Sequence, residues 1–116
     1  MDDCIFCKIA SGEIPANVVY SDDEFVAFDD IAPQGPVHAL VIPRHHYRNL
    51  RDGVPADLMG RLCAVVGKVA ETKGVADSGY RVIVNDGPDA GQEVDHLHVH
   101  VIGGGRMAAG LVSFAP

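Results

Sequence analysis

The stretch DHLHVHVI at residues 95–102 places histidines at every second position, with leucine and valine between them. Successive side chains of a β-strand point to opposite faces of the sheet. On a strand, therefore, His96, His98 and His100 form a row on one face, and the apolar residues between them cover a core on the other. A helix would scatter the three rings around its axis, and the β-branched valines also favour a strand. The stretch predicts a half-buried strand whose polar face is suited to imidazole chemistry.

Length and composition predict one globular domain spanning residues 1–116. The chain is 47% hydrophobic and 22% charged, which is ordinary for a protein that buries a single core. Its net charge of −7 argues against a nucleic-acid-binding protein, which needs a basic surface. No apolar run approaches the length of a membrane span. The odd number of cysteines, two of them only three residues apart, indicates a reducing, cytoplasmic setting.

A Cys-x-x-Cys pair, Cys4 and Cys7, lies near the start of the chain. Such a pair is commonly half of a zinc site or a redox pair. The redox motif follows a strand, and no strand is predicted before residue 4, so the sequence favours a metal. The two thiols could instead be small packing side chains. Residues 5–9 predict a short helical turn with an apolar side.

Four further strands and one long helix are predicted from the remaining pattern. Apolar residues recur at helical spacing from about residue 55 to residue 72, and Gly74 is a plausible C-terminal cap. Cys63 falls inside this helix and is expected to be a packed thiol. Because only one long helix is available for a crossover, the sheet is expected to be mostly antiparallel and the fold class α+β. The four strands are predicted at residues 18–20, 25–29, 37–42 and 80–84.

Two loops carry polar side chains next to predicted strands. Asp29 and Asp30 end a strand, where a solvated turn is the simpler interpretation, although Asp is also a good acceptor for ribose hydroxyls. The glycine-containing loop at residues 85–94 runs directly into the histidine strand. Its bare main-chain N–H groups, together with the amides of Asn85 and Gln92, suit a bound phosphate.

Three histidines in a row allow two kinds of chemistry. They could bind one catalytic metal ion together, but three rings along a straight strand converge poorly on one ion. Alternatively, the central His98 attacks phosphorus as a neutral imidazole, and a flanking ring protonates the leaving group. His96 is then free to complete a closed zinc site with Cys4, Cys7 and His46, which follows the third predicted strand.

The histidine motif and several other segments resemble the Hint branch of the histidine-triad family. The resemblance covers nearly the whole chain. It implies a histidine-triad α+β fold, a five-stranded antiparallel sheet with one long helix and a short N-terminal helix. It also implies a homodimer whose two sheets join across the long helix and the fourth strand. The other segments that carry it are IFCKI at 5–9, GEIP at 12–15, AFDDI at 27–31, VIP at 41–43, residues 85–94 and the glycines at 103–104.

The same resemblance implies hydrolysis or transfer at the α-phosphate of purine nucleotides, such as conjugates of AMP or GMP, without a catalytic cofactor. It implies that His98 forms the nucleotidyl intermediate, oriented by the main-chain carbonyl of His96, and that His100 lies near the leaving group. Gln92 is implied beside them as a catalytic and phosphate-binding residue. The remaining nucleotide-binding positions would be Ile5, Phe6, Ile9, Phe28 and Ile31 for the base, Asp30 for the ribose, and Asn85, Gly91 and Glu93 for the phosphate.

Zinc is implied by the Cys-x-x-Cys pair, because some family members with such a pair bind a structural zinc ion. The corresponding ligands here would be Cys4, Cys7, His46 and His96. Two features depart from the Hint pattern. Glu93 stands where a small hydroxyl residue is common, so we expect it to contribute its main-chain N–H. The tail also has no tryptophan, which leaves the leaving-group preference open.

Two other functions compete with the hydrolase prediction. One is a nucleotide-binding interaction module with weak or vestigial hydrolase activity, and the other is a zinc hydrolase with three histidine ligands. A bound partner is expected to be a purine nucleotide or a second copy of the chain, not a nucleic acid or a membrane.

Overall fold

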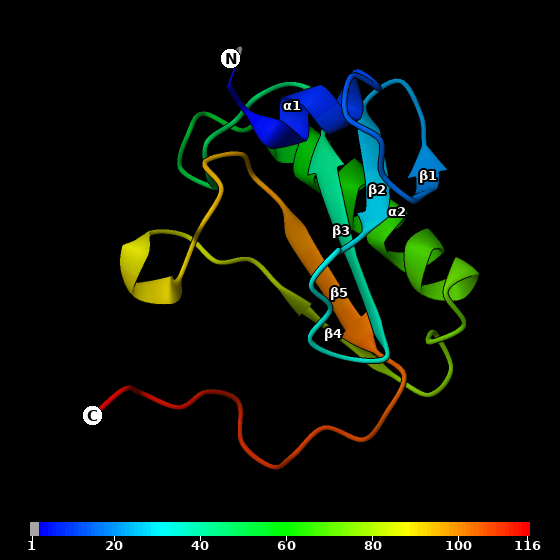
Figure 1. The fold of residues 1–116 in the computed structure, drawn as a ribbon, viewed down its shortest axis with the longest axis vertical. Coiled ribbons are helices and arrows are strands. Elements are labelled where there is room, and N and C mark those ends of the chain that lie inside the picture. The colour runs from blue at the N-terminus through cyan, green and yellow to red at the C-terminus, as the bar shows by residue number, and fades with distance from the viewer. Residues whose placement is uncertain (1–2) are drawn as a thin grey trace.

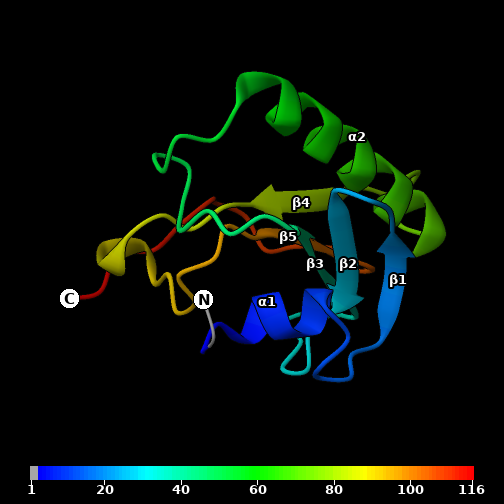
Figure 2. The same ribbon diagram turned by 90° about the horizontal axis from the view of Figure 1, so that it is seen from above.

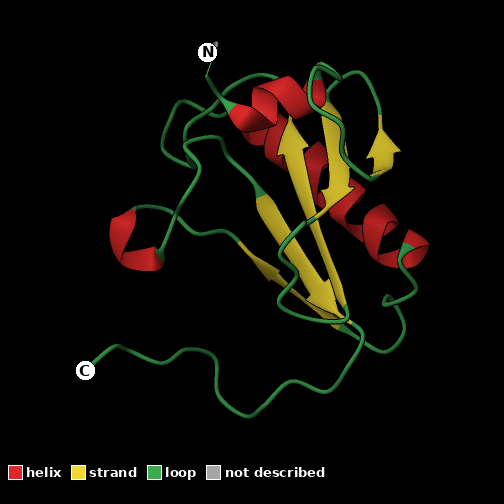
Figure 3. Cartoon of the chain, in the orientation of Figure 1, coloured by secondary structure: helices red, strands yellow, loops and turns green. Residues whose placement is uncertain are grey.

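The computed structural model describes residues 3–116, which form a five-stranded antiparallel sheet with one helix on each face (Figures 1 and 2). The strand order across the sheet is β1-β2-β3-β5-β4. Both the predicted α+β class and the antiparallel sheet are confirmed. In chain order, the elements are α1 (Ile5–Ala10), β1 (Val18–Ser21), β2 (Phe25–Asp29), β3 (Val37–Pro43), α2 (Ala56–Thr72), β4 (Tyr80–Ile83), the 3₁₀ helix η1 (Pro88–Ala90) and β5 (Val99–Gly103) (Figure 3).

Both faces of the sheet are covered, and the two faces have different partners. In Figure 2, α2 lies on one side of the sheet and α1 on the other. Residues at alternate strand positions, such as Val41 and Val101, pack against α2 in the larger core. The intervening positions, such as Leu40 and Ile42, belong to a second core that includes Phe6 of α1. Since side chains alternate along a strand, the even-numbered histidines of β3 and β5 lie on the α1 face.

Helix α2 has the predicted position and end. It begins at Ala56, directly after Pro55, and Gly74 follows it with a φ of +76°, a conformation that glycine adopts without strain. Leu62 is only 1% exposed and anchors the apolar side of the helix on the sheet. The prediction that Cys63 is packed is wrong, because the next position along the helix points outward and leaves this thiol exposed.

Strand β5 begins at Val99, later than the sequence predicted. Only His100 of the three motif histidines therefore belongs to a strand, whereas His96 and His98 lie in the segment that leads into it. The pairing of β5 with β3 ends at Val99, and the main chain before that point makes no ladder bonds. The row of three rings on one strand face is thus wrong in detail, although Leu97 and Val99 are buried as predicted.

The C-terminal segment, residues 104–116, has no helix or strand and extends away from the sheet (Figures 1 and 3). Three of its apolar side chains, available for packing by their sequence, are exposed: Leu111 at 82%, Val112 at 79% and Phe114 at 93%. Within the described part of the chain, no helix combines the length and apolar character needed to cross a lipid bilayer.

Candidate functional site

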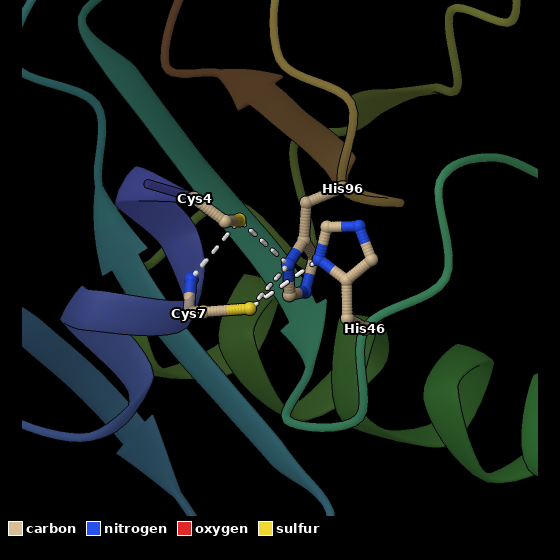
Figure 4. A group of neighbouring side chains, drawn as sticks. All are labelled: Cys4, Cys7, His46 and His96. Carbon is tan, nitrogen blue, oxygen red and sulfur yellow. Dashed lines mark hydrogen bonds between the residues drawn. The ribbon is translucent and has the colours of Figure 1, made fainter. Parts of the chain in front are cut away.

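A cluster of two cysteines and two histidines joins α1 to the sheet (Figure 4). The Sγ atom of Cys4 lies 3.3 Å from Nδ1 of His96, and the Sγ atom of Cys7 lies 3.3 Å from Nδ1 of His46. The four donor atoms all lie within 4.8 Å of one another. Cys4 caps α1, and its sulfur accepts the main-chain N–H of Cys7 at 3.3 Å, which places both sulfurs together. The structure thus brings together the four residues predicted as metal ligands.

The chemistry of these four donors fits a zinc ion. Tetrahedral Zn–S and Zn–N bonds separate a sulfur from a nitrogen by about 3.5 Å, close to the 3.3–3.5 Å found here. His96 Nε2 donates to the carbonyl oxygen of Pro43 at 2.8 Å, so its Nδ1 lone pair faces the sulfurs. Burial lowers the pKa of His96 to about 4, which keeps it neutral. Burial and the neighbouring Cys4 raise the pKa of Cys7 to about 11, a value that a bound divalent cation would lower strongly.

The central histidine of the motif, His98, is held with one nitrogen free. The residue is 7% exposed. Its Nδ1 lies 2.7 Å from the main-chain carbonyl oxygen of His96, which can only accept, so Nδ1 carries the proton. Its Nε2 then bears the lone pair and has no hydrogen-bond partner in residues 3–116. The ring edge-packs against Phe6, with centroids 5.1 Å apart. This is the state that an imidazole nucleophile requires.

The third histidine of the motif, His100, ends a chain of hydrogen bonds that starts at a main-chain amide. Gln34 N–H donates to His38 Nδ1 at 3.0 Å, which places the His38 proton on Nε2. That Nε2–H donates to His100 Nδ1 at 2.8 Å, so His100 carries its own proton on Nε2. His100 Nε2 is buried, with no partner among the described residues. Burial chiefly, and then His98 and His38, lower the pKa of His100 to about 4, so it is a neutral donor.

Asp30 lies beside this pair of histidines. Its Oδ2 is 3.5 Å from His38 Nε2, and its Oδ1 accepts the N–H of Ala32 at 2.8 Å. Asp30, His38 and His100 are close enough together to suggest a second metal site. The tautomer of His38 argues against it, because the nitrogen facing the cluster holds a proton and has no lone pair for an ion. The group therefore acts through hydrogen bonds.

The loop before β5 is closed by Gln92. Its Oε1 accepts from Gly87 N at 3.0 Å, and its Nε2 donates to two main-chain carbonyls at 2.7 and 3.2 Å. Positive φ angles of +92° at Gly87 and +78° at Gly91 make the turn possible. The N–H groups of Gly91 and Gln92 bond within the loop, whereas Glu93 N–H has no acceptor in the described chain. Asn85 is half-buried at the start of this loop.

The residues predicted to hold a nucleobase divide into buried and exposed groups. Phe6 and Phe28 are 7% and 4% exposed, with ring centroids 5.5 Å apart, and Ile9 packs partly against them. Ile5 and Ile31, by contrast, are 45% and 97% exposed. The structure therefore offers an apolar floor beside His98 and exposed isoleucines that are free to contact a ligand.

Comparisons with known proteins agree with this architecture. A family model described as HIT domain matches residues 11–107. The chain belongs to the HIT domain family. It is 44% identical over 106 residues to purine nucleoside phosphoramidase of Escherichia coli, covering 89% of this chain and 88% of that protein. It is 47% identical over 114 residues to the 14 kDa zinc-binding protein of Brassica juncea, covering 90% and 96%. A histidine triad protein from Clostridium difficile superimposes with a TM-score of 0.90 at 46% identity, covering 96% of this chain and 98% of that one.

One residue of this HIT domain site, His38, was missed by the sequence analysis. The available signal was a lone polar residue in the apolar strand at 37–42. Its even number places it on the same face as Leu40 and opposite the α2 core, diagonal to His100 on the neighbouring strand.

The structure also contradicts the alternative in which three histidines hold one metal ion. In this HIT domain the three rings face different partners. His96 faces the cysteines, His98 faces a main-chain carbonyl and His100 faces His38.

Proposed function

We propose that this HIT family hydrolase cleaves the bond between the α-phosphorus and a leaving group, above all nitrogen, in purine nucleotide conjugates. The observation that carries the proposal is the state of His98, whose Nδ1–H is held by a carbonyl at 2.7 Å while Nε2 keeps its lone pair. The E. coli relative named purine nucleoside phosphoramidase supports the choice of bond and substrate class.

The reaction would proceed in two displacements on phosphorus. His98 Nε2 forms a bond to the α-phosphorus, and the P–N bond to the leaving amine breaks as that nitrogen, which accepts a hydrogen bond from His100 Nε2–H, takes a proton from solvent. The Nε2–H of His38 keeps the single proton of His100 on Nε2, facing the departing nitrogen. Water then attacks the phosphorus, gives up a proton to solvent, and releases the nucleoside monophosphate from His98. The His96 carbonyl stabilises the positive charge on the ring of His98 in the intermediate.

Substrate binding is assigned to groups around this centre. The side chain of Asp30 is 20% exposed, and its Oδ2 is proposed to accept hydrogen bonds from the ribose hydroxyls. Glu93 offers a main-chain N–H to a phosphate oxygen. The base would lie against Phe6 and the exposed Ile5 and Ile31. Gln92 is assigned to shaping the loop, because its amide bonds Gly87 and Val94 within the loop and also donates to the main-chain carbonyl of Arg48.

A structural zinc ion at Cys4, Cys7, His46 and His96 is part of the proposal. The donor set and its 3.3–3.5 Å spacing support it, and so does the relative named a zinc-binding protein. When bound, such an ion fixes the positions of its ligands and supplies no step of the reaction. Because zinc binding requires reduced thiols, we place the protein in the cytoplasm.

We also propose a homodimer that forms along β4. This strand lies at one edge of the sheet, so one side of its backbone is unpaired. Val82 on β4 is 48% exposed, and the apolar tail residues Leu111 and Phe114 are 82% and 93% exposed. A surface hollow runs along this edge, lined by residues 78–82 and 105–107. Sedimentation of the purified protein tests this: a monomer at micromolar concentration would contradict it.

Hydrolysis of adenosine 5′-phosphoramidate by the purified protein tests the function. Release of AMP is expected from the wild-type protein and should be abolished in His98→Ala. His45→Ala is a matched control, since His45 is an exposed histidine with no assigned role at the phosphorus and its ring lies against that of Tyr47, with centroids 4.5 Å apart. Full turnover by His98→Ala would refute the proposal. Binding of AMP without turnover of the phosphoramidate or of any nucleoside pyrophosphate would favour an interaction module.

A further inference from the structure

Helix α1 carries both cysteines of the metal cluster and the ring that touches the proposed nucleophile. Phe6 lies between Cys4 and Cys7 in the sequence. Its ring centroid is 5.1 Å from that of His98 and 6.0 Å from that of His96, edge-on in both cases. The metal cluster and the nucleophile are therefore neighbours through a single side chain.

The cluster reaches His98 by a second route, through the main chain. The side chain of His96 lies in the cluster, and the carbonyl of the same residue holds His98 Nδ1 at 2.7 Å. The cluster ligand and the carbonyl that orients His98 thus belong to one residue. Both contacts that orient His98, one from Phe6 and one from His96, thus depend on residues in or beside the cluster.

The two ends of α1 are attached differently. At its C-terminal end, Arg44 Nη1 donates to Ala10 O at 2.6 Å, and Arg44 Nε donates to Asp22 O at 2.7 Å. This anchor needs no metal. At its N-terminal end, the attachments are the cluster and the Phe6 ring. A helix of only six residues has little stability of its own, so its N-terminal end follows the state of the cluster.

We propose that a zinc ion bound by the cluster holds His98 in place and closes the nucleoside side of the site. Metal occupancy would then control nucleotide binding as well as stability. This rests on the proposed function. The larger core, between α2 and the other face of the sheet, contains no residue of α1, so we expect it to stay folded when the metal is removed. Loss of zinc would therefore leave the sheet folded, free the N-terminal end of α1, withdraw Phe6 and release the fixed tautomer of His98.

The test compares zinc-loaded protein with protein stripped by a chelator. Four quantities are measured on each: the bound zinc per chain, the far-ultraviolet circular dichroism, the AMP dissociation constant and the ¹⁵N shifts of the His98 ring. We expect unchanged circular dichroism, AMP affinity weaker by about tenfold, the size of one lost aromatic contact, and His98 shifts that average over both tautomers. Re-addition of zinc should restore affinity and shifts together.

The zinc-dependent attachment of α1 and His98 is called the clamp below. Two variants separate loss of the clamp from general loss of folded structure. His46→Ala removes one proposed ligand that has no assigned nucleotide contact, and it should reproduce the stripped state. Cys63→Ser removes the exposed thiol of α2 and should leave zinc content and AMP affinity unchanged.

Each remaining outcome overturns one claim. Stripped protein with unchanged AMP affinity and unchanged His98 shifts would overturn the clamp, as would wild-type protein that binds no zinc. Zinc-loaded protein that neither binds AMP nor cleaves the phosphoramidate would overturn the proposed function instead, while the His98 shifts would still test the clamp.

Discussion

Replacement of His38 by asparagine tests the hydrogen-bond chain that orients His100. His38 is 3% exposed and donates to His100 Nδ1 at 2.8 Å, so its removal leaves a buried acceptor without a donor. The loss of such a partner costs about 1–3 kcal/mol. Part of this cost appears as loss of the Nε2–H tautomer of His100, the form that faces the leaving group. Because about 1.4 kcal/mol corresponds to a tenfold change in rate, we expect kcat to fall by roughly 10- to 100-fold.

The assay for His38→Asn is steady-state hydrolysis of adenosine 5′-phosphoramidate, with kcat and KM determined separately. KM should change less than kcat, since His38 donates to His100 at 2.8 Å and lies farther, 3.5 Å, from the Asp30 carboxylate proposed to bind the ribose. His45→Asn, at an exposed histidine, should retain wild-type values. A His38→Asn enzyme with wild-type kcat, or with its entire loss in KM, would refute the assignment of His38.

Three further predictions concern pH, the loop and the core. His100 has its pKa lowered to about 4, mainly by burial, so the unfolded chain binds a proton below about pH 6.5 that the folded chain excludes. The contribution of His100 to the free energy of unfolding should be fully present above about pH 6.5 and should fall by about 1 kcal/mol, allowing for solvent screening, as the pH drops toward 4. Urea unfolding of His100→Gln should therefore show a weaker dependence on pH. Gln92→Ala should raise KM by about tenfold through loosening of the loop, whereas a loss confined to kcat would show that the amide acts on the transition state. Leu62→Ala, at a 1% exposed core position, should lower the free energy of unfolding by about 2–5 kcal/mol, against less than about 0.5 kcal/mol for Cys63→Ala beside it.

Regular elements were predictable because their signals are local. A short apolar run after a polar turn gave β2 its bounds at Phe25–Asp29, and helical spacing with Gly74 as cap gave the end of α2. The start of β5 was not predictable in this way. Its length depends on how far β3 pairs with it, which is a property of the neighbouring strand.

The chemistry of the site was predictable only where residue types announce it. Two cysteines and two histidines in such a combination predict a metal site, and the fold brings Cys4, Cys7, His46 and His96 together. His38 carried too little local signal, because a single polar residue in an apolar strand has many explanations. The hydrogen bonds of the Gln92 amide to Gly87 in its own loop and to Arg48 in another segment depend on backbone turns that sequence pattern does not resolve.

The wrong prediction for Cys63 and the failure to predict a role for His38 have the same physical origin. Both depend on which side of an element faces the sheet, and that is decided by contacts between elements distant in sequence. His38 is 62 positions from its partner His100, a separation over which local propensity says nothing.

The most direct measurement of the central claim is a search for the covalent intermediate. The protein is mixed with adenosine 5′-phosphoramidate, quenched in alkali during the first turnover and digested for mass spectrometry. Transient addition of one adenylyl group to the peptide that contains His98, on the Nε2 atom, is the predicted result. Release of AMP at the full rate while that peptide stays unmodified throughout the first turnover would contradict the account.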